Sequence, residues 1–279
     1  GSSSVLNLNG TISSCKAGSS GGGVYLGTNS SAKLVMNGGT ISGCTAGSQG
    51  GGVYVSYSST VEMSNSSQIE NCSAVKDGGG LYLYGSDAHL VMDNSSISNC
   101  SASKSGGAAY LAGQYTGISM DSSTISNCSA PSAGGIYLSG GHASASMENS
   151  SSISGCTATS SYGGGAYLSG QYAAMTMQNG SSISGCTATG SYGYGGGAYL
   201  MGNNAELVMD SSSISNCTAA SGGGAGLSGV QAELKLENGS EITGCTAANS
   251  GGGAYLHGLG GRSSNAKLTL ENSSIKNCR

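Results

Sequence analysis

The sequence contains no tryptophan, no phenylalanine and one proline, and only 8 % of its 279 residues are charged. An ordinary globular domain has about 25 % charged residues, and disordered chains are commonly rich in charge. Arg262 and Arg279 are the only arginines, and the formal net charge is −4. Because no basic stripe is present, we expect no nucleic-acid partner.

Long apolar runs are also missing, so the sequence contains no segment that would span a membrane. The chain opens with GSSSVLNLNG and closes with NSSIKNCR, and both stretches already belong to a repeating pattern. Solenoid proteins normally end in polar capping units, and neither end resembles one. We therefore expect residues 1–279 to be a single segment of a longer chain or a unit that stacks end to end.

Glycine and cysteine are abundant and regularly placed, with 52 glycines and ten cysteines. The gaps between successive cysteines are 29, 28, 28, 28, 28, 30, 31, 28 and 33 residues. A repeat period of about 20 to 50 residues indicates a repeat architecture. The cysteines are Cys15, Cys44, Cys72, Cys100, Cys128, Cys156, Cys186, Cys217, Cys245 and Cys278.

Each repeat divides into three short apolar pieces. The first resembles GGGAYL (163–168), the second resembles AELVMD (205–210), and the third reads SISNC or SISGC. Alternation of apolar and polar residues over short pieces indicates strands, and the glycine clusters would break a helix. The sequence therefore predicts an all-β protein, a parallel β-helix of about nine coils of ~28 residues with three short strands per coil.

The inward positions of such a coil can be followed along the chain. The third piece has isoleucine in every repeat, the second has methionine or leucine, and the first has leucine or valine. Parallel strands in register lie about 4.8 Å apart, so nine coils would make a rod about 45 Å long. The isoleucines are Ile12, Ile41, Ile69, Ile97, Ile125, Ile153, Ile183, Ile214, Ile242 and Ile275.

The residue before each cysteine is glycine, asparagine or serine. Glycine and asparagine tolerate a positive φ, so we predict a left-handed residue that bends the chain and leaves the following cysteine pointing inward. Four of these asparagines also begin Asn-Cys-Ser/Thr sequons and are possible glycosylation sites in a secreted protein. They are Asn71, Asn99, Asn127 and Asn216.

One cysteine per coil predicts a column of sulfur atoms, for which two interpretations stay open. Cysteine is often buried as a small apolar residue, which favours a column of free thiols. Neighbouring Cα atoms about 4.8 Å apart also fall within the range of a disulfide, although in-register geometry would strain it. Paired metal-ligand spacings such as C-x-x-C do not occur.

Tyrosine occupies the middle of the first strand in eight repeats, between two inward residues, so alternation predicts that it faces outward. Gly226 is the gap in this series. Ring stacking between coils is one interpretation; the other is an aromatic strip for glycans, cell-surface molecules or lateral self-association, extended by Tyr57, Tyr84, Tyr115 and Tyr172. The eight are Tyr25, Tyr54, Tyr82, Tyr110, Tyr137, Tyr167, Tyr199 and Tyr255.

The repeat, for example ITGCTAANSGGGAYL (242–256), resembles the repeats of polymorphic-membrane-protein-like adhesins. Those repeats pair a GGA[I/L] motif with an FxxN motif on a right-handed β-helix. This sequence has isoleucine in place of the phenylalanine and cysteine in place of the stacked asparagine. The resemblance implies a right-handed coil and a cell-surface or extracellular location, and it transfers no catalytic residue.

Residues for catalysis are sparse. Asp93 and Asp121 follow methionines in adjacent repeats; an acid pair is one interpretation, and solvated carboxylates at a turn are the favoured one. The repeat is irregular at 189–194 and at 257–265, and the second segment contains His257 and Arg262. The histidines build no triad or metal site, so we expect no enzyme, cofactor or metal. We expect a structural or adhesive solenoid, a surface rod or filament subunit that associates with itself. The alternatives are a carbohydrate-binding module and a carbohydrate-active enzyme.

Overall fold

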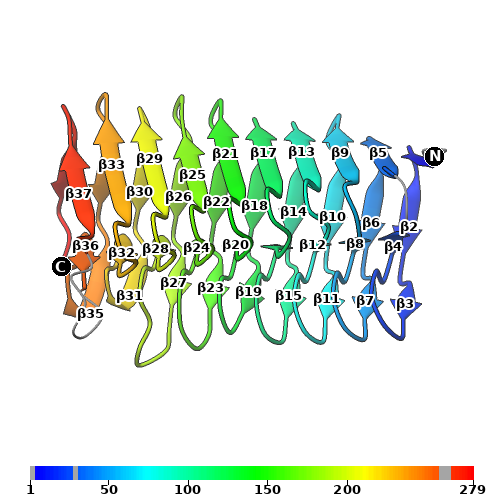
Figure 1. Cartoon of the computed structure of the whole chain (residues 1–279), viewed down its shortest axis with the longest axis horizontal. Coiled ribbons are helices and arrows are strands. Elements are labelled where there is room, and N and C mark those ends of the chain that lie inside the picture. The colour runs from blue at the N-terminus through cyan, green and yellow to red at the C-terminus, as the bar shows by residue number, and fades with distance from the viewer. Residues whose placement is uncertain (1–3, 28–30, 258–264) are drawn as a thin grey trace.

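The computed structural model describes residues 4–27, 31–257 and 265–279, and every regular element in these residues is a β-strand. The strands form four parallel sheets, two of ten strands and two of nine. Successive strands along the chain belong to different sheets, and each sheet gains one strand per coil. Figure 1 shows the resulting solenoid, with the two termini at opposite ends of its long axis.

We name the sheets A to D. Sheet A contains β1 (Val5–Leu8), β5 (Lys33–Asn37), β9 (Thr60–Ser64), β13 (His89–Asp93), β17 (Gly117–Asp121), β21 (Ser144–Glu148), β25 (Ala174–Met177), β29 (Glu206–Asp210), β33 (Glu233–Glu237) and β37 (Lys267–Leu270). Sheet B contains β2 (Thr11–Ser13), β6 (Thr40–Ser42), β10 (Gln68–Glu70), β14 (Ser96–Ser98), β18 (Thr124–Ser126), β22 (Ser152–Ser154), β26 (Ser182–Ser184), β30 (Ser213–Ser215), β34 (Glu241–Thr243) and β38 (Ser274–Lys276).

The other two sheets have shorter strands. Sheet C contains β3 (Lys16–Ala17), β7 (Thr45–Ala46), β11 (Ser73–Ala74), β15 (Ser101–Ala102), β19 (Ser129–Ala130), β23 (Thr157–Ala158), β27 (Thr187–Ala188), β31 (Thr218–Ser221) and β35 (Thr246–Ser250). Sheet D contains β4 (Val24–Leu26), β8 (Val53–Val55), β12 (Leu81–Leu83), β16 (Ala109–Leu111), β20 (Ile136–Leu138), β24 (Ala166–Leu168), β28 (Ala198–Leu200), β32 (Ala225–Leu227) and β36 (Ala254–Leu256).

The coil has four strands and not the predicted three. Sheet C, formed by the residues directly after each cysteine, is the strand set that sequence reasoning missed. Seven of its strands have only two residues, which is too short for an alternating pattern to be recognised. The prediction of an all-β parallel solenoid with about nine coils of ~28 residues is confirmed.

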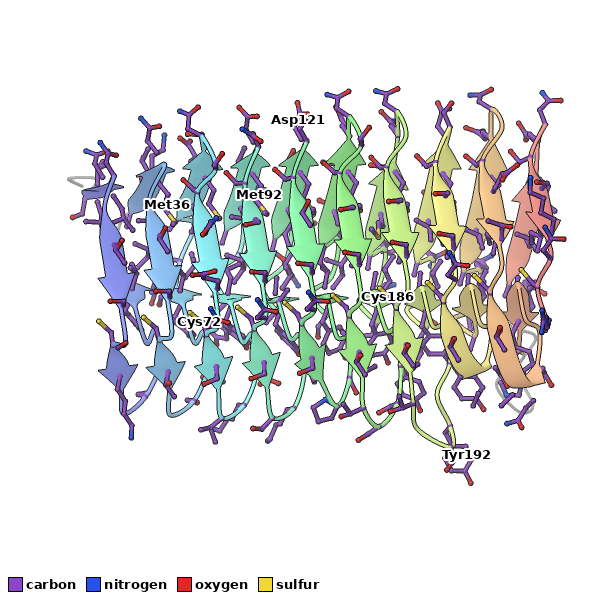
Figure 2. The ribbon with its side chains drawn as sticks, turned by 180° about the vertical axis from the view of Figure 1, so that it is seen from behind. Met36, Cys72, Met92, Asp121, Cys186 and Tyr192 are labelled. Carbon is purple, nitrogen blue, oxygen red and sulfur yellow. The ribbon has the colours of Figure 1, made fainter. Side chains whose placement is uncertain are left out.

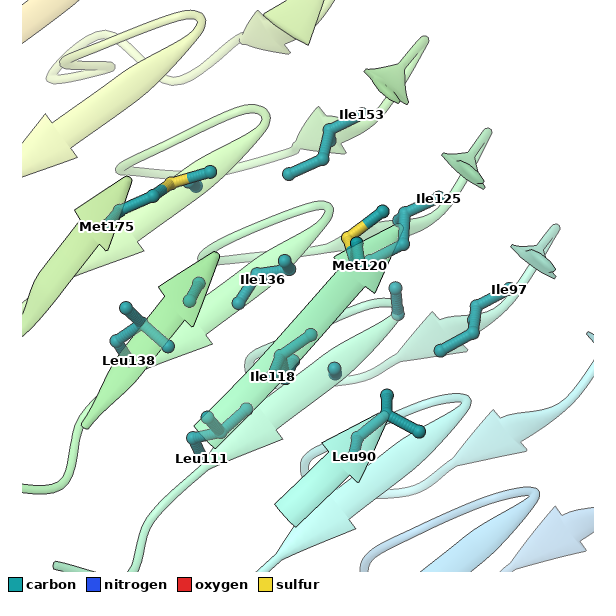
Figure 3. Close-up of a cluster of buried hydrophobic side chains, with 14 of the residues drawn as sticks. Leu90, Ile97, Leu111, Ile118, Met120, Ile125, Ile136, Leu138, Ile153 and Met175 are labelled. Atoms are coloured by element: carbon teal, nitrogen blue, oxygen red, sulfur yellow. The ribbon is translucent and has the colours of Figure 1, made fainter. Parts of the chain in front are cut away.

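The core is a single apolar cluster that runs through the bore of the solenoid. Like residues pair between neighbouring coils, as Ile97 does with Ile125 and Met92 with Met120. Figure 3 shows Ile97, Ile125 and Ile153 following one another along the axis. The predicted inward columns are therefore confirmed, although Leu256 and Leu270 in the last coil are exposed.

The predicted left-handed residue precedes every cysteine. Its φ angle ranges from 53° at Ser14 and Asn127 to 64° at Gly244. The bend lets the following cysteine point inward, and eight of the ten cysteines are buried. One Thr-Ala or Ser-Ala pair per coil then continues the ladder as sheet C from β7 to β35.

Candidate functional site: the tyrosine ladder and the thiol column

The eight predicted tyrosines of sheet D stand outside the main core and form a ladder of stacked rings, which we call the tyrosine ladder. Ring centroids of Tyr25 and Tyr54 are 5.0 Å apart, and those of Tyr137 and Tyr167 are 4.6 Å apart. One step differs, because Tyr110 meets Tyr137 edge-on with an interplanar angle of 84°. The register of sheet D places one tyrosine directly over the next.

The ladder is far less open than an exposed binding strip would be. Tyr82, Tyr167 and Tyr199 are buried, with Tyr167 only 4 % exposed. Most ring faces are covered by the rings of neighbouring coils, and Tyr167, Tyr199 and Ala133 belong to a second apolar cluster outside the bore. The ladder therefore stabilises the solenoid as an outer apolar layer.

The tyrosine hydroxyl groups also have partners within the chain. Tyr110 donates to Ser139 Oγ at 3.2 Å, and Ser169 Oγ donates to the Tyr137 hydroxyl at 3.0 Å. The Tyr199 hydroxyl and Ser228 Oγ are 2.6 Å apart. Each serine follows a sheet D strand by one residue, so the turn after the strand anchors the rings.

The gap at Gly226 is filled by a tyrosine from another part of the chain. Tyr194, in the longer loop between β27 and β28, stacks on Tyr199 at 5.6 Å and on Tyr255 at 5.8 Å. Its ring thereby continues the ladder past Gly226. A Cβ atom on Gly226 would lie 2.8 Å from Tyr199 Cδ2, so the glycine makes room for this arrangement. The irregular stretch 189–194 thus has a structural explanation.

We expect Tyr194→Ala to lower the free energy of unfolding by about 1–2 kcal/mol, because stacked aromatic pairs contribute about 0.5–1.5 kcal/mol each. Gly226→Tyr alone should also destabilise, since two rings would compete for one space. The double variant Tyr194→Ala/Gly226→Tyr should recover part of the lost free energy of unfolding. Its new ring at position 226 would occupy the space that the Tyr194 ring leaves. Urea denaturation of the parent, the two single variants and the double variant measures this double-mutant cycle. If the two single losses simply add in the double variant, Tyr194 does not fill the gap at Gly226.

Burial changes the ionisation of the ladder. Burial, followed by the charges of neighbouring tyrosines, raises the pKa of Tyr199 to about 12 despite its hydrogen bond to Ser228. Burial likewise raises the pKa of Tyr82 and of Tyr167 above the ordinary tyrosine value. These shifts stabilise the fold while the hydroxyl groups remain protonated.

We expect the stability of the protein to fall in alkaline solution. A raised folded-state pKa stabilises the fold fully below the unfolded-state value of about 10, and this stabilisation is lost as the pH rises through the folded-state value. The free energy of unfolding should therefore decline from about pH 10 to beyond pH 12. Urea denaturation at increasing pH, followed by tyrosinate absorbance, measures the decline. A free energy that stays constant through this range would contradict it.

The ten cysteines form the predicted column and are all free thiols in the structure. Cys100 Sγ donates to the carbonyl oxygen of Ser98 at 3.3 Å, and Cys72 Sγ donates to that of Glu70 at 3.3 Å. These carbonyl groups belong to the strand end before the left-handed residue. The buried thiols therefore satisfy backbone acceptors as well as filling the core.

We expect the buried thiols to be unreactive in the folded protein. Burial raises the pKa of the Cys44 thiol, and neighbouring thiols and then burial raise that of Cys156. Hydrogen bonds from neighbouring thiols lower the pKa of Cys186 and Cys245, but both side chains are fully buried and closed to a reagent in solution. Since the thiolate is the reactive form, an alkylating reagent should modify the exposed Cys15 rapidly, Cys278 more slowly and the other eight only after unfolding. Mass spectrometry counts the modified sites. Fewer than ten in the denatured, unreduced protein would support bridges between coils instead.

Asp93 and Asp121 lie on adjacent coils, as register partners in β13 and β17. Asp121 Oδ1 accepts hydrogen bonds from Asn149 Nδ2 at 2.9 Å and from Ser122 Oγ at 3.0 Å. Asp210 has the same two kinds of partner, Asn238 and Ser211. The repetition indicates that these carboxylates organise the turn between sheets A and B.

The remaining predicted positions are more scattered. Asn71, Asn99, Asn127 and Asn216 are exposed at left-handed turns, so their side chains are accessible to modification. In the irregular segment 257–265, His257 Nδ1 lies 3.2 Å from the Tyr255 hydroxyl, and Arg262 lies outside the described residues. Among the described residues, no group of three or more His, Cys, Asp or Glu side chains is arranged to hold a metal ion.

Four exposed tyrosines follow the strands of sheet D. Tyr57, Tyr84, Tyr115 and Tyr172 extend the aromatic surface toward sheet A, as predicted. Tyr115 and Tyr172 stack on opposite sides of His142 with centroid separations of 4.9 Å each. Sequence reasoning missed this His142 contact, because turn residues give no alternation signal; the shared left-handed φ of the three residues brings them into one file.

Comparison of the sequence with known protein families agrees with the β-solenoid fold. A family described as "Right handed beta helix region" matches residues 2–179 and 123–279, which together include nearly the whole chain. The chain belongs to this right-handed β-helix family. No curated protein and no solved structure matches the chain. Since one fold can carry many functions, the family establishes the architecture and leaves the function to the site.

Proposed function

We propose that the protein is a structural or adhesive solenoid without catalytic activity, acting as a cell-surface rod or as a subunit of an extracellular filament. The regular ladders support this proposal. Sheets A and B continue through ten strands each, and the side chains that stack along them are structural in every coil. An enzyme of this fold would be expected to break the repeat with unlike polar residues gathered at one level.

The observation that carries the proposal is the continuity of the ladder. Neighbouring coils pair through the same four parallel sheets along its length. A strand edge of such a coil acts as a template for pairing with another chain. A second copy that paired in the same way would lengthen the rod.

Electron microscopy and sedimentation of the 279-residue chain at increasing concentration test axial stacking. We expect filaments whose length grows with concentration. Leu6→Lys, in the end strand β1 of sheet A, should abolish them, whereas Val91→Lys on the side of the solenoid should not; both residues are 40 % exposed. A compact monomer at every concentration would overturn the filament form of the proposal.

An extracellular location is part of the proposal and is supported by the resemblance to polymorphic-membrane-protein-like repeats. The structure is compatible with an oxidising environment, because eight of the ten thiols are buried and shielded from oxidants. No helix in the described part of the chain is long and apolar enough to cross a membrane. Proteolysis of intact source cells, followed by detection of the chain, tests its surface exposure.

Carbohydrate binding is the second candidate function. The tyrosine ladder itself supports it poorly, because its ring faces are covered by neighbouring rings and a sugar needs a free face. The exposed tyrosines after sheet D support it better. An uncharged recess beside Tyr57 and Tyr84 is the observation that favours this candidate.

A further inference from the structure

The turns from sheet D to sheet A have the same length in six successive coils, and the turn that precedes these six is shorter. Five residues connect the strands in each coil from β12–β13 to β32–β33, but only residues 56–59 connect β8 to β9. The five-residue turns each contain a left-handed residue, such as Asp87, Tyr115 or His142. Residues 56–59 contain none. The shorter turn leaves a step in the surface of the solenoid.

A recess of about 420 Å³ lies at this step. Its size falls within the range of about 300–1,000 Å³ found for small-molecule sites. Tyr57 is 46 % exposed and Tyr84 is 58 % exposed, so both rings can reach a ligand. The lining residues are Ser56, Tyr57, Ser58, Tyr84, Gly85, Ser86 and Ala112.

Gly85 allows the two coils to approach closely at the recess. A Cβ atom on Gly85 would collide with the backbone of Tyr57. Ser58 Oγ donates to the carbonyl oxygen of Ser86 at 2.8 Å, which ties the short turn to the next one. The recess is therefore held by backbone contacts and is formed before any ligand arrives.

The two tyrosines differ in how they are packed. Tyr84 lies nearly parallel to Tyr54 and Tyr82, with centroid separations of 6.5 and 6.4 Å. Tyr57 stacks on no other ring within the described residues, and it is 46 % exposed, so part of its ring is free to meet a ligand. An open aromatic face beside serine hydroxyl groups suits a ligand with C–H groups on one side and hydroxyl groups around its edge.

We propose that this recess binds a neutral sugar residue, with the C–H face of the sugar on Tyr57 and its hydroxyl groups toward the serines. The inference rests on the proposed adhesive function and gives it a ligand class. No charged residue lines the recess, and the nearby Asp87 is an acid. The carboxylate of an acidic sugar would therefore be repelled by Asp87, and no cation in the lining would compensate. A neutral sugar would meet no such repulsion.

Saturation-transfer NMR and tyrosine fluorescence test the proposal with glucose, galactose, mannose and N-acetylglucosamine as neutral probes. Glucuronic acid and N-acetylneuraminic acid are the acidic controls. We expect at least one neutral sugar to bind with a dissociation constant in the millimolar range. Tyr57→Ala should weaken this binding at least about tenfold, which corresponds to about 1.4 kcal/mol. Tyr172→Ala is the matched control, since Tyr172 is also 46 % exposed in a turn after sheet D.

A second variant, Ser86→Trp, should block the recess by volume at an exposed position while preserving the strand ladders. Circular dichroism and thermal unfolding confirm that each variant is folded. The proposal is overturned if no neutral sugar binds, if the acidic sugars bind equally well, or if Tyr57→Ala binds as the parent does. Loss of self-association in Tyr57→Ala without sugar binding in the parent would assign the recess to a second copy instead.

The same samples separate this inference from the rod proposal. Filaments without sugar binding would refute the recess alone. Sugar binding by a chain that remains a compact monomer at every concentration would refute the filament alone.

Discussion

Gly196→Ala is expected to lower the free energy of unfolding by about 3 kcal/mol or more, because the added methyl group would overlap backbone atoms of the next coil. A Cβ atom on Gly196 would lie 2.5 Å from the carbonyl oxygens of both Gly223 and Thr218. These are backbone atoms of the next coil and cannot rotate away. Relief therefore requires two coils to separate, which breaks the ladder hydrogen bonds between them. Thermal and urea denaturation followed by circular dichroism measure the loss.

Gly80→Ala is the matched control for this change. Its added Cβ would meet one backbone atom, Ala108 O at 2.7 Å, and two side-chain atoms, Ile97 Cγ2 at 3.0 Å and Cys100 Sγ at 3.3 Å. The equivalent position in the next coil is already alanine, at Ala108. We therefore expect a cost of only about 1 kcal/mol for Gly80→Ala. If Gly80→Ala and Gly196→Ala lose the same free energy of unfolding, the close approach of the coils at Gly196 does not explain the destabilisation.

Tyr167→Ala is expected to lower the free energy of unfolding by about 3 kcal/mol, as removal of a buried aromatic side chain usually does. The ring is 4 % exposed and stacks on Tyr137 at 4.6 Å and on Tyr199 at 5.6 Å. Its hydroxyl group donates to Met201 Sδ at 3.0 Å. Tyr167→Phe keeps the stacking and should cost less than about 1.5 kcal/mol.

Tyr192→Ala is the control for a tyrosine outside the ladder. Tyr192 is 75 % exposed at the tip of the loop between β27 and β28, where Figure 2 shows it projecting away from the solenoid. Its removal should leave stability within about 0.5 kcal/mol of the parent. If Tyr167→Ala were as stable as Tyr192→Ala, the ladder would not be an outer apolar layer and its role as a binding strip would regain support.

Much of the architecture could be predicted because the repeat fixes which residues share a column. The invariant isoleucine, the alternating second strand and the glycine or asparagine before each cysteine each predict a local conformation. Neighbouring coils then repeat that conformation in register, as Ile125 over Ile97 shows. In a solenoid each coil contacts only the neighbouring coils. The repeat pattern in the sequence is therefore sufficient to predict which residues pack together.

Sheet C and the Tyr194 contact could not be predicted in this way. A two-residue strand such as Thr157–Ala158 has no periodicity of its own, and it forms because the left-handed turn delivers it against its neighbour. Tyr194 reaches the space above Gly226 because its loop is longer than the equivalent loops. The sequence marks this loop as irregular but does not show where its side chain lies.

The sequence by itself determined the coil, its period, its inward columns and the position of its cysteines. Tertiary structure alone decided that three of the outward tyrosines, Tyr82, Tyr167 and Tyr199, are buried. It also decided that Tyr115, His142 and Tyr172 stack, and that a turn shortened by one residue opens a recess beside Tyr57. The physical reason is that alternation specifies which side of a strand a residue occupies. How much of that side remains accessible depends on the turns and loops that pack over it.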